Sequence, residues 1–91
     1  MKTYEESLAK VRGMVEEKLS NERKLVGLAT CLVEARSDSG QVAELEKEIG
    51  YLKWRNQVLS GSIRGAVSML FFIYEEDSHD IAGDIDSFTM L

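Results

Sequence analysis

The apolar residues between Val42 and Ile73 recur at alternating intervals of three and four positions, and no other feature constrains the fold as strongly. This spacing is that of a heptad repeat, whose a and d positions share one side of an α-helix. Most a positions hold a β-branched residue and most d positions hold leucine, which is typical of two-stranded parallel coiled coils. These positions, named here the heptad seam, are Val42, Leu45, Ile49, Leu52, Asn56, Leu59, Ile63, Ala66, Leu70 and Ile73. We expect a second copy of the chain to pack against this seam.

Asn56 occupies an a position near the middle of the heptad seam. A single Asn at such a position fixes the register and the number of strands at some cost in stability. With its leucines and this Asn, the stretch 42–73 resembles a leucine-zipper dimerisation seam. Basic residues do not precede it as they do in zipper transcription factors, so the resemblance implies dimerisation without DNA recognition.

The composition favours helices, because the 91 residues include no proline and are rich in Glu, Lys, Leu and Ala. The expected fold class is therefore all-α. A monomer of this length buries a limited fraction of its surface, so a dimer that shares a core would be more stable.

Residues 1–77 divide into two long helical stretches and one short turn. We expect a first helix over residues 4–36, a turn over 37–40 and a second helix over 41–76. A connection this short makes the two helices antiparallel, so the expected protomer is a long helical hairpin.

Capping residues support both helix starts. Thr3 and Glu6 form a capping box, in which the Thr3 hydroxyl accepts a hydrogen bond from the Glu6 amide. Asp38 precedes Gln41 by three residues and can cap the second helix in the same way.

The second helix also carries apolar and small residues on the side opposite the heptad seam. They are Tyr51, Trp54, Val58, Gly61, Gly65 and Phe72. We expect this second stripe to pack against the first helix, with Leu19 near Val58 and Val11 near Gly65. The heptad seam is then left for the partner, and the dimer becomes a four-helix bundle-like assembly.

Two other arrangements remain open at the level of the sequence. A lone hairpin could use the heptad seam internally and leave Tyr51, Trp54 and Phe72 for a different partner. Alternatively, residues 60–62 could break the second helix and produce a three-helix fold.

Residues 78–91 are predicted to form an acidic amphipathic tail or short helix. Residues 1–74 contain ten acidic and eleven basic residues, whereas residues 75–91 contain six acidic residues and no Lys or Arg. The tail and the aromatic end of the second helix could dock on a basic partner protein, although the tail could also fold over its own core or fray. The candidate partner-binding residues are Phe71, Glu75, Glu76, Asp77, Asp80, Ile81, Asp84, Ile85, Asp86 and Phe88.

Catalytic patterns are nearly absent from the sequence. Its one His and one Cys, His79 and Cys31, are far apart, and Cys31 lies among apolar residues that suggest a buried thiol. No glycine-rich phosphate loop or metal-binding pattern is present. We therefore expect no enzyme, no cofactor and no bound metal.

These features favour a small cytoplasmic homodimeric adaptor or inhibitor that docks on another protein. The balanced charge of residues 1–74 argues against direct nucleic-acid binding, and the longest uncharged run is too short to span a membrane. Two alternatives are an acidic decoy that mimics nucleic acid and inhibits a DNA-processing or nuclease complex, and a structural assembly subunit. A small acidic chain of this kind would suit an accessory protein of a phage or mobile element.

Overall fold

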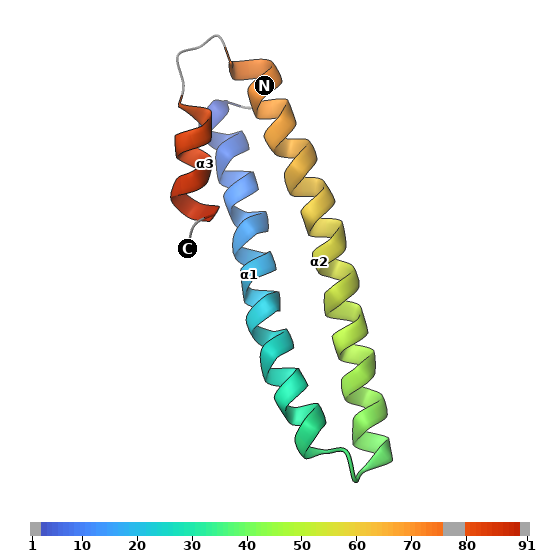
Figure 1. Cartoon of the computed structure of the whole chain (residues 1–91). Coiled ribbons are helices and arrows are strands. Elements are labelled where there is room, and N and C mark those ends of the chain that lie inside the picture. Colours follow the sequence, from blue (N-terminus) through green and yellow to red (C-terminus); the bar gives the residue numbers. More distant parts are fainter. Residues whose placement is uncertain (1–2, 76–79, 90–91) are drawn as a thin grey trace.

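The computed structural model describes residues 3–75 and 80–89, which form three α-helices (Figure 1). Helix α1 spans Tyr4–Glu34, α2 spans Ser39–Tyr74 and α3 spans Ile81–Thr89. Helices α1 and α2 run antiparallel along their whole length, and α3 lies against the N-terminal part of α1 (Figure 1). The described residues contain no strand. The prediction of an all-α fold with two long packed helices is confirmed.

Both long helices begin at the predicted caps. The backbone amide of Glu6 donates a hydrogen bond to the Thr3 hydroxyl at 3.2 Å, and the amide of Gln41 donates to Asp38 Oδ1 at 3.2 Å. Helix α2 is continuous through residues 60–62, so the second helix does not break there.

The molecule is a rod that is only two helices thick over most of its length. Its Cα radius of gyration is 17.4 Å, whereas a globular chain of this length has about 12 Å. Its principal extents are 58 × 22 × 15 Å. Each long helix can therefore cover only one side of the other.

The side of α2 that α1 covers is the heptad seam, which corrects our assignment of the two stripes. Leu52, Leu59 and Leu70 are buried, and most other seam positions are half-buried. Leu70 joins a core cluster with Val11 and Val15 of α1. The predicted dimer seam thus faces α1 of the same chain, and the arrangement is that of a hairpin that uses its heptad seam internally.

The alignment of the two helices along their length agrees with the prediction, although α2 is rotated about its axis. The side-chain amide of Asn21 donates to Asn56 Oδ1 at 3.0 Å, close to the predicted pairing of Leu19 with Val58. Asn21 is buried, so it needs a polar partner inside the interface, and only the seam side of α2 offers one at this height. With this rotation Asn21 reaches Asn56 across the interface.

Helix α3 closes the core at one end of the rod. Ile81 is 3% exposed and belongs to the same core cluster as Leu70, and Ile85 packs against that cluster. The Tyr4 hydroxyl donates to Asp84 Oδ2 at 2.6 Å, which joins α1 to α3. The backbone amide of Gly83 donates to Asp80 Oδ1 at 3.1 Å and satisfies the helix start. The described part of the tail therefore docks on its own hairpin.

Candidate protein-interaction surface

The side of α2 that points away from α1 carries the largest exposed apolar side chains of the described residues. Phe72 is 84% exposed, Tyr51 59% and Trp54 57%. Three-and-four spacing places them on one side of the helix. We name this side the outer face, and it consists of Tyr51, Trp54, Val58, Gly61, Gly65, Ser68, Met69 and Phe72. Tyr51, Trp54 and Phe72 were predicted to pack against α1. They lie instead on the side of α2 that faces away from α1.

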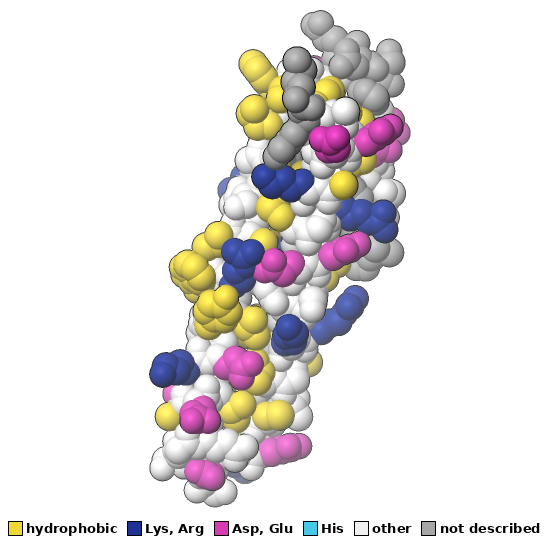
Figure 2. Space-filling view, turned by 180° about the vertical axis from the view of Figure 1, so that it is seen from behind, with side chains coloured by type: hydrophobic (Ala, Val, Ile, Leu, Met, Phe, Trp, Pro, Cys, Tyr) yellow, Lys and Arg dark blue, Asp and Glu magenta, His cyan; other side chains and the backbone are white. Residues whose placement is uncertain are grey.

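The outer face forms a band rather than a set of scattered residues. Figure 2 shows hydrophobic side chains gathered along the α2 edge, in the middle of the rod and near the end that carries α3. The rings of Tyr51 and Trp54 contact each other, with centroids 6.0 Å apart and an interplanar angle of 38°. Exposed apolar patches of this kind mark interaction sites in soluble proteins.

Glycines occupy the centre of the outer face. A Cβ atom added at Gly61 or Gly65 would meet no atom within 4 Å, so the hairpin itself does not require glycine at either position. Glycine also weakens a helix relative to alanine. Their position leaves a shallow, open stretch of backbone between the aromatic residues on either side.

An apolar groove adjoins the outer face near α3. It has a volume of about 560 Å³ and lies between the start of α1 and the end of α2. Its lining residues are Ser7, Lys10, Ala66, Met69, Leu70, Ile73 and Tyr74. Because Met69 belongs to both, the groove extends the apolar surface of the outer face toward α1.

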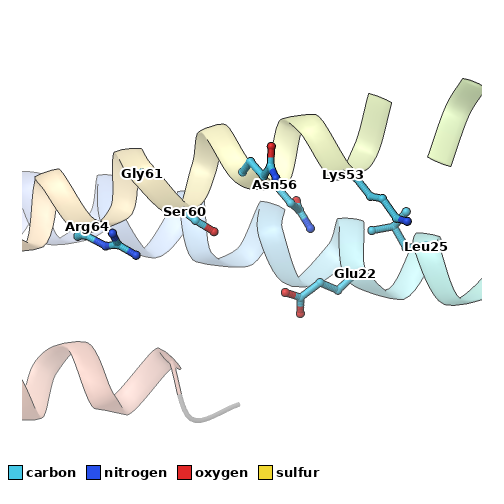
Figure 3. Close-up of a pocket in the computed structure, with 8 residues that line it drawn as sticks. Glu22, Leu25, Lys53, Asn56, Ser60, Gly61 and Arg64 are labelled. Carbon is cyan, nitrogen blue, oxygen red and sulfur yellow. The ribbon is translucent and has the colours of Figure 1, made fainter. Parts of the chain in front are cut away.

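A second groove, of about 570 Å³, is lined mainly by polar and charged residues and lies beside the Asn21–Asn56 pair. Glu22 and Leu25 line it from α1, and the remaining lining residues, among them Lys53 and Arg64, come from α2. Lys53 and Arg64 lie at opposite ends of the groove (Figure 3), about 16 Å apart along the helix axis. These charges do not converge on one point, so the groove lacks the geometry of a catalytic or anion site.

An ion pair ties the middle of α2 to α1. Arg55 Nε lies 2.6 Å from Glu17 Oε2, and Arg55 Nη2 donates to Glu17 Oε1 at 3.1 Å. Hydrogen bonding from Arg55 lowers the pKa of the Glu17 carboxyl, and the same contact raises the pKa of Arg55. Because two hydrogen bonds join Arg55 to Glu17, the pair fixes the orientation of the Arg55 guanidinium as well as the alignment of α2 with α1.

The structure separates the candidate partner-binding residues into three groups. Phe71, Glu75, Asp80 and Asp86 are exposed at the end of the rod that carries α3. Ile81, Ile85 and Asp84 make contacts within the chain, with the core cluster or with Tyr4, so they do not form part of an open surface. Glu76, Asp77 and the side chain of Phe88 lie outside the described residues.

Cys31 corrects one further expectation, because it is exposed and not a buried apolar residue. Within residues 3–75 and 80–89, no group of three or more His, Cys, Asp or Glu side chains is placed to hold a metal ion. The absence of enzymatic activity remains a prediction.

Comparison with protein-family models, curated proteins and solved structures gives no match for this chain. By length and composition alone, α2 is long and apolar enough to cross a membrane, and only 11% of its most apolar stretch is buried. A single helix of this kind does not establish where the protein lies.

Two residues of the site were missed at the level of the sequence. Met69 extends the outer face because it lies four residues after Gly65 and three before Phe72, a spacing that the sequence shows. Asn21 was given no role at the level of the sequence, although it is the partner of Asn56. A polar residue on an apolar stripe opposite another polar residue was the available signal.

Proposed function

We propose that this protein is a non-enzymatic protein-binding module, a small homodimeric helical hairpin that acts by docking on another protein as an adaptor or inhibitor. The observation that supports it is the outer face of α2, where Tyr51, Trp54 and Phe72 are more than half exposed. Aromatic side chains are enriched at protein interfaces because they bury a large area and lose little conformational freedom.

The outer face and the α3 end have different chemistry and suit different partners. None of the outer-face residues is charged, and between residues 57 and 74 the only charged residue is Arg64, so the outer face suits another apolar surface. The α3 end exposes Glu75, Asp80 and Asp86, and no Lys or Arg follows Arg64 in the sequence. A basic surface on the target protein would complement that end.

The charge distribution disfavours the decoy alternative. A mimic of nucleic acid needs carboxylates along the rod, but α1 and α2 carry both signs interspersed, as in the Arg12–Glu16 and Lys18–Glu22 pairs. The excess of acids is confined to one end. Docking on a protein through a local acidic patch fits this layout better than replacement of a phosphate backbone.

Site-specific photo-crosslinking in the native host tests the proposed function. A photoreactive phenylalanine analogue replaces Trp54 on the outer face, Asp86 at the α3 end, or Arg23 on the exposed side of α1 as the matched control. We expect the Trp54 position to give a covalent product of two chains and the Asp86 position to give a product with a different protein. If neither position crosslinks above the Arg23 level, the protein-binding function is wrong.

A further inference from the structure

We propose that the outer face of α2 packs on the outer face of α2 in a second copy of the chain, with the two helices antiparallel and a two-fold axis between Gly61 and Gly65. This pairing rests on the homodimer of the proposed function. It adds the surface, the orientation and the centre of that dimer.

The monomer exposes more surface than a folded chain of its mass normally does. Its accessible surface is 6631 Å². A folded monomer of 10.2 kDa has roughly 5,300 Å² of accessible surface. A protein–protein interface of standard size buries about 800 Å² on each partner, which would remove more than half of this excess of about 1,300 Å².

The apolar area of the outer face matches the area that a stable dimer needs. An aromatic side chain has roughly 150–250 Å² of surface, so the exposed parts of Tyr51, Trp54 and Phe72 amount to on the order of 400 Å². Val58 and Met69 raise this to roughly 500 Å². A standard interface buries about 800 Å² per partner and a homodimer interface is about 65% apolar, which also corresponds to roughly 500 Å².

The order of side-chain sizes along the outer face is self-complementary. Small residues occupy its centre at Gly61 and Gly65, and large residues lie on both sides at Trp54 and Phe72. In an isologous contact, when residue i of one copy contacts residue j of the second, residue j of the first copy also contacts residue i of the second. With the axis at the height of residue 63, Gly61 lies opposite Gly65 of the second copy and Trp54 opposite its Phe72. Backbones that approach closely at the glycines bring both pairs of aromatic rings into contact.

The charges select the antiparallel orientation. A parallel dimer would bring two copies of the acidic end side by side, although residues 65–91 contain no Lys or Arg to neutralise them. In the antiparallel dimer, each α2 ends eleven residues beyond the axis, or about 17 Å at a rise of about 1.5 Å per residue. The two ends of α2 are then about 33 Å apart, well beyond the Debye length of about 8 Å at physiological salt.

This orientation determines how the dimer would present its target-binding ends. The two acidic ends would lie at opposite sides of the central contact and face opposite directions along the rod. Such a dimer fits a target that is itself two-fold symmetric or that carries two separated basic sites, and linkage of the two sites would raise the overall affinity.

Sedimentation equilibrium together with a spin-label distance tests the inference. The full chain carries Cys31→Ser to remove the native thiol and Glu46→Cys as the labelled position, which is exposed and away from the outer face. We expect a mass of two chains and a distance between labels of about 50 Å, because residue 46 is seventeen positions from the axis. A dimer with labels closer than about 30 Å overturns the antiparallel orientation and leaves the proposed function intact.

Matched variants identify the surface. Trp54→Glu introduces a charge on the outer face, and Val26→Glu introduces the same charge at a 70% exposed position of α1. We expect Trp54→Glu to lower the dimer affinity at least a hundredfold with the helical circular dichroism unchanged, and Val26→Glu to leave the affinity unchanged. A mass of one chain for the parent protein at hundreds of micromolar contradicts the homodimer itself. Co-flotation of the parent with phosphatidylcholine vesicles, abolished by Trp54→Glu, would assign the outer face to a lipid surface and overturn the pairing.

Discussion

At the scale of single residues, the amide pair of Asn21 and Asn56 determines how the two long helices meet. The Asn21 side chain donates to Asn56, and the Asn56 side chain donates in turn to the Lys18 carbonyl at 3.4 Å. A shift of one helix by a single turn would leave buried amide groups without partners, which costs more than the bonds contribute when made. The pair therefore acts mainly on alignment rather than on stability.

Breaking this pair from one side should destabilise the protein. We expect Asn56→Val to lower the free energy of unfolding by about 1–3 kcal/mol, because the buried Asn21 amide loses its acceptor on α2. We expect the double variant Asn21→Leu with Asn56→Leu to recover the parent value or exceed it, since no polar group is then left buried. Urea unfolding at one fixed protein concentration measures both effects.

The matched control for this experiment is Gln57→Val, which changes an amide to the same apolar residue at the neighbouring exposed position. It should change the free energy of unfolding by less than about 0.5 kcal/mol. Additive effects of Asn21→Leu and Asn56→Leu, measured singly and together in a double-mutant cycle, would show that the Asn21–Asn56 bond does not form in solution.

The residue scale also shows what the sequence could predict. The a-position Asn56 was predicted to lie between two copies of the chain, whereas the structure places it opposite Asn21 of α1 in the same chain. Its partner could not be identified, because the heptad pattern is the same whether the opposing helix belongs to the same chain or to a second one. The caps at Thr3 and Asp38 were predictable because they depend only on residues three positions apart.

At the scale of elements, α2 illustrates why faces are harder to predict than helices. It is apolar on the seam side and again on the outer face, so periodicity fixes the helix but not which side α1 covers. The predicted stripe at Tyr51 and Trp54 was assigned to the wrong contact for this reason. The choice between the two sides involves long-range pairs such as Asn21–Asn56, whose members are 35 residues apart in the sequence.

The contact between α3 and α1 should depend on alkaline pH. Burial, and then the hydrogen bond and charge of Asp84, raise the pKa of Tyr4 from 10.0 to about 12. Tyr4 holds its phenol proton more tightly when α3 is docked on α1 than when α3 is released. The contribution of the Tyr4 hydroxyl to the docking of α3 is therefore complete below pH 10 and is lost as the pH rises toward 12. We expect the Ile81 side-chain methyl signals in NMR spectra to move toward their released position over that range.

Two comparisons make this prediction specific to the Tyr4 phenol. The methyl signals of Ile63, which lies between α1 and α2, report general unfolding over the same range. Tyr4→Phe keeps the ring but removes the hydroxyl, so α3 should be partly released already at neutral pH and should show no phenolate-dependent step. Equal pH profiles for Ile81 in the parent protein and in Tyr4→Phe would contradict the role of this contact.

At the scale of the whole molecule, a two-helix rod has too few layers to cover all its large apolar side chains. The described core consists of a few buried residues, whereas the exposed large apolar residues include three aromatics on one side of α2. Such a chain is expected to gain stability from association, because burial of the outer face removes apolar area from water without further ordering of the chain. The thermal stability of the protein should therefore depend on its concentration.

For a dimer that unfolds to separate chains, a tenfold increase in concentration stabilises the folded state by about 1.4 kcal/mol. With an unfolding entropy of about 2.1 cal/mol/K for each residue of two 91-residue chains, the midpoint of thermal unfolding should rise by about 4 °C per tenfold increase. Circular dichroism at 222 nm between about 1 and 100 micromolar measures the shift. Trp54→Glu should melt at a midpoint that does not change with concentration, whereas Val26→Glu should retain the shift. A midpoint of the parent protein that stays constant over this range would show that the hairpin is stable without a second copy.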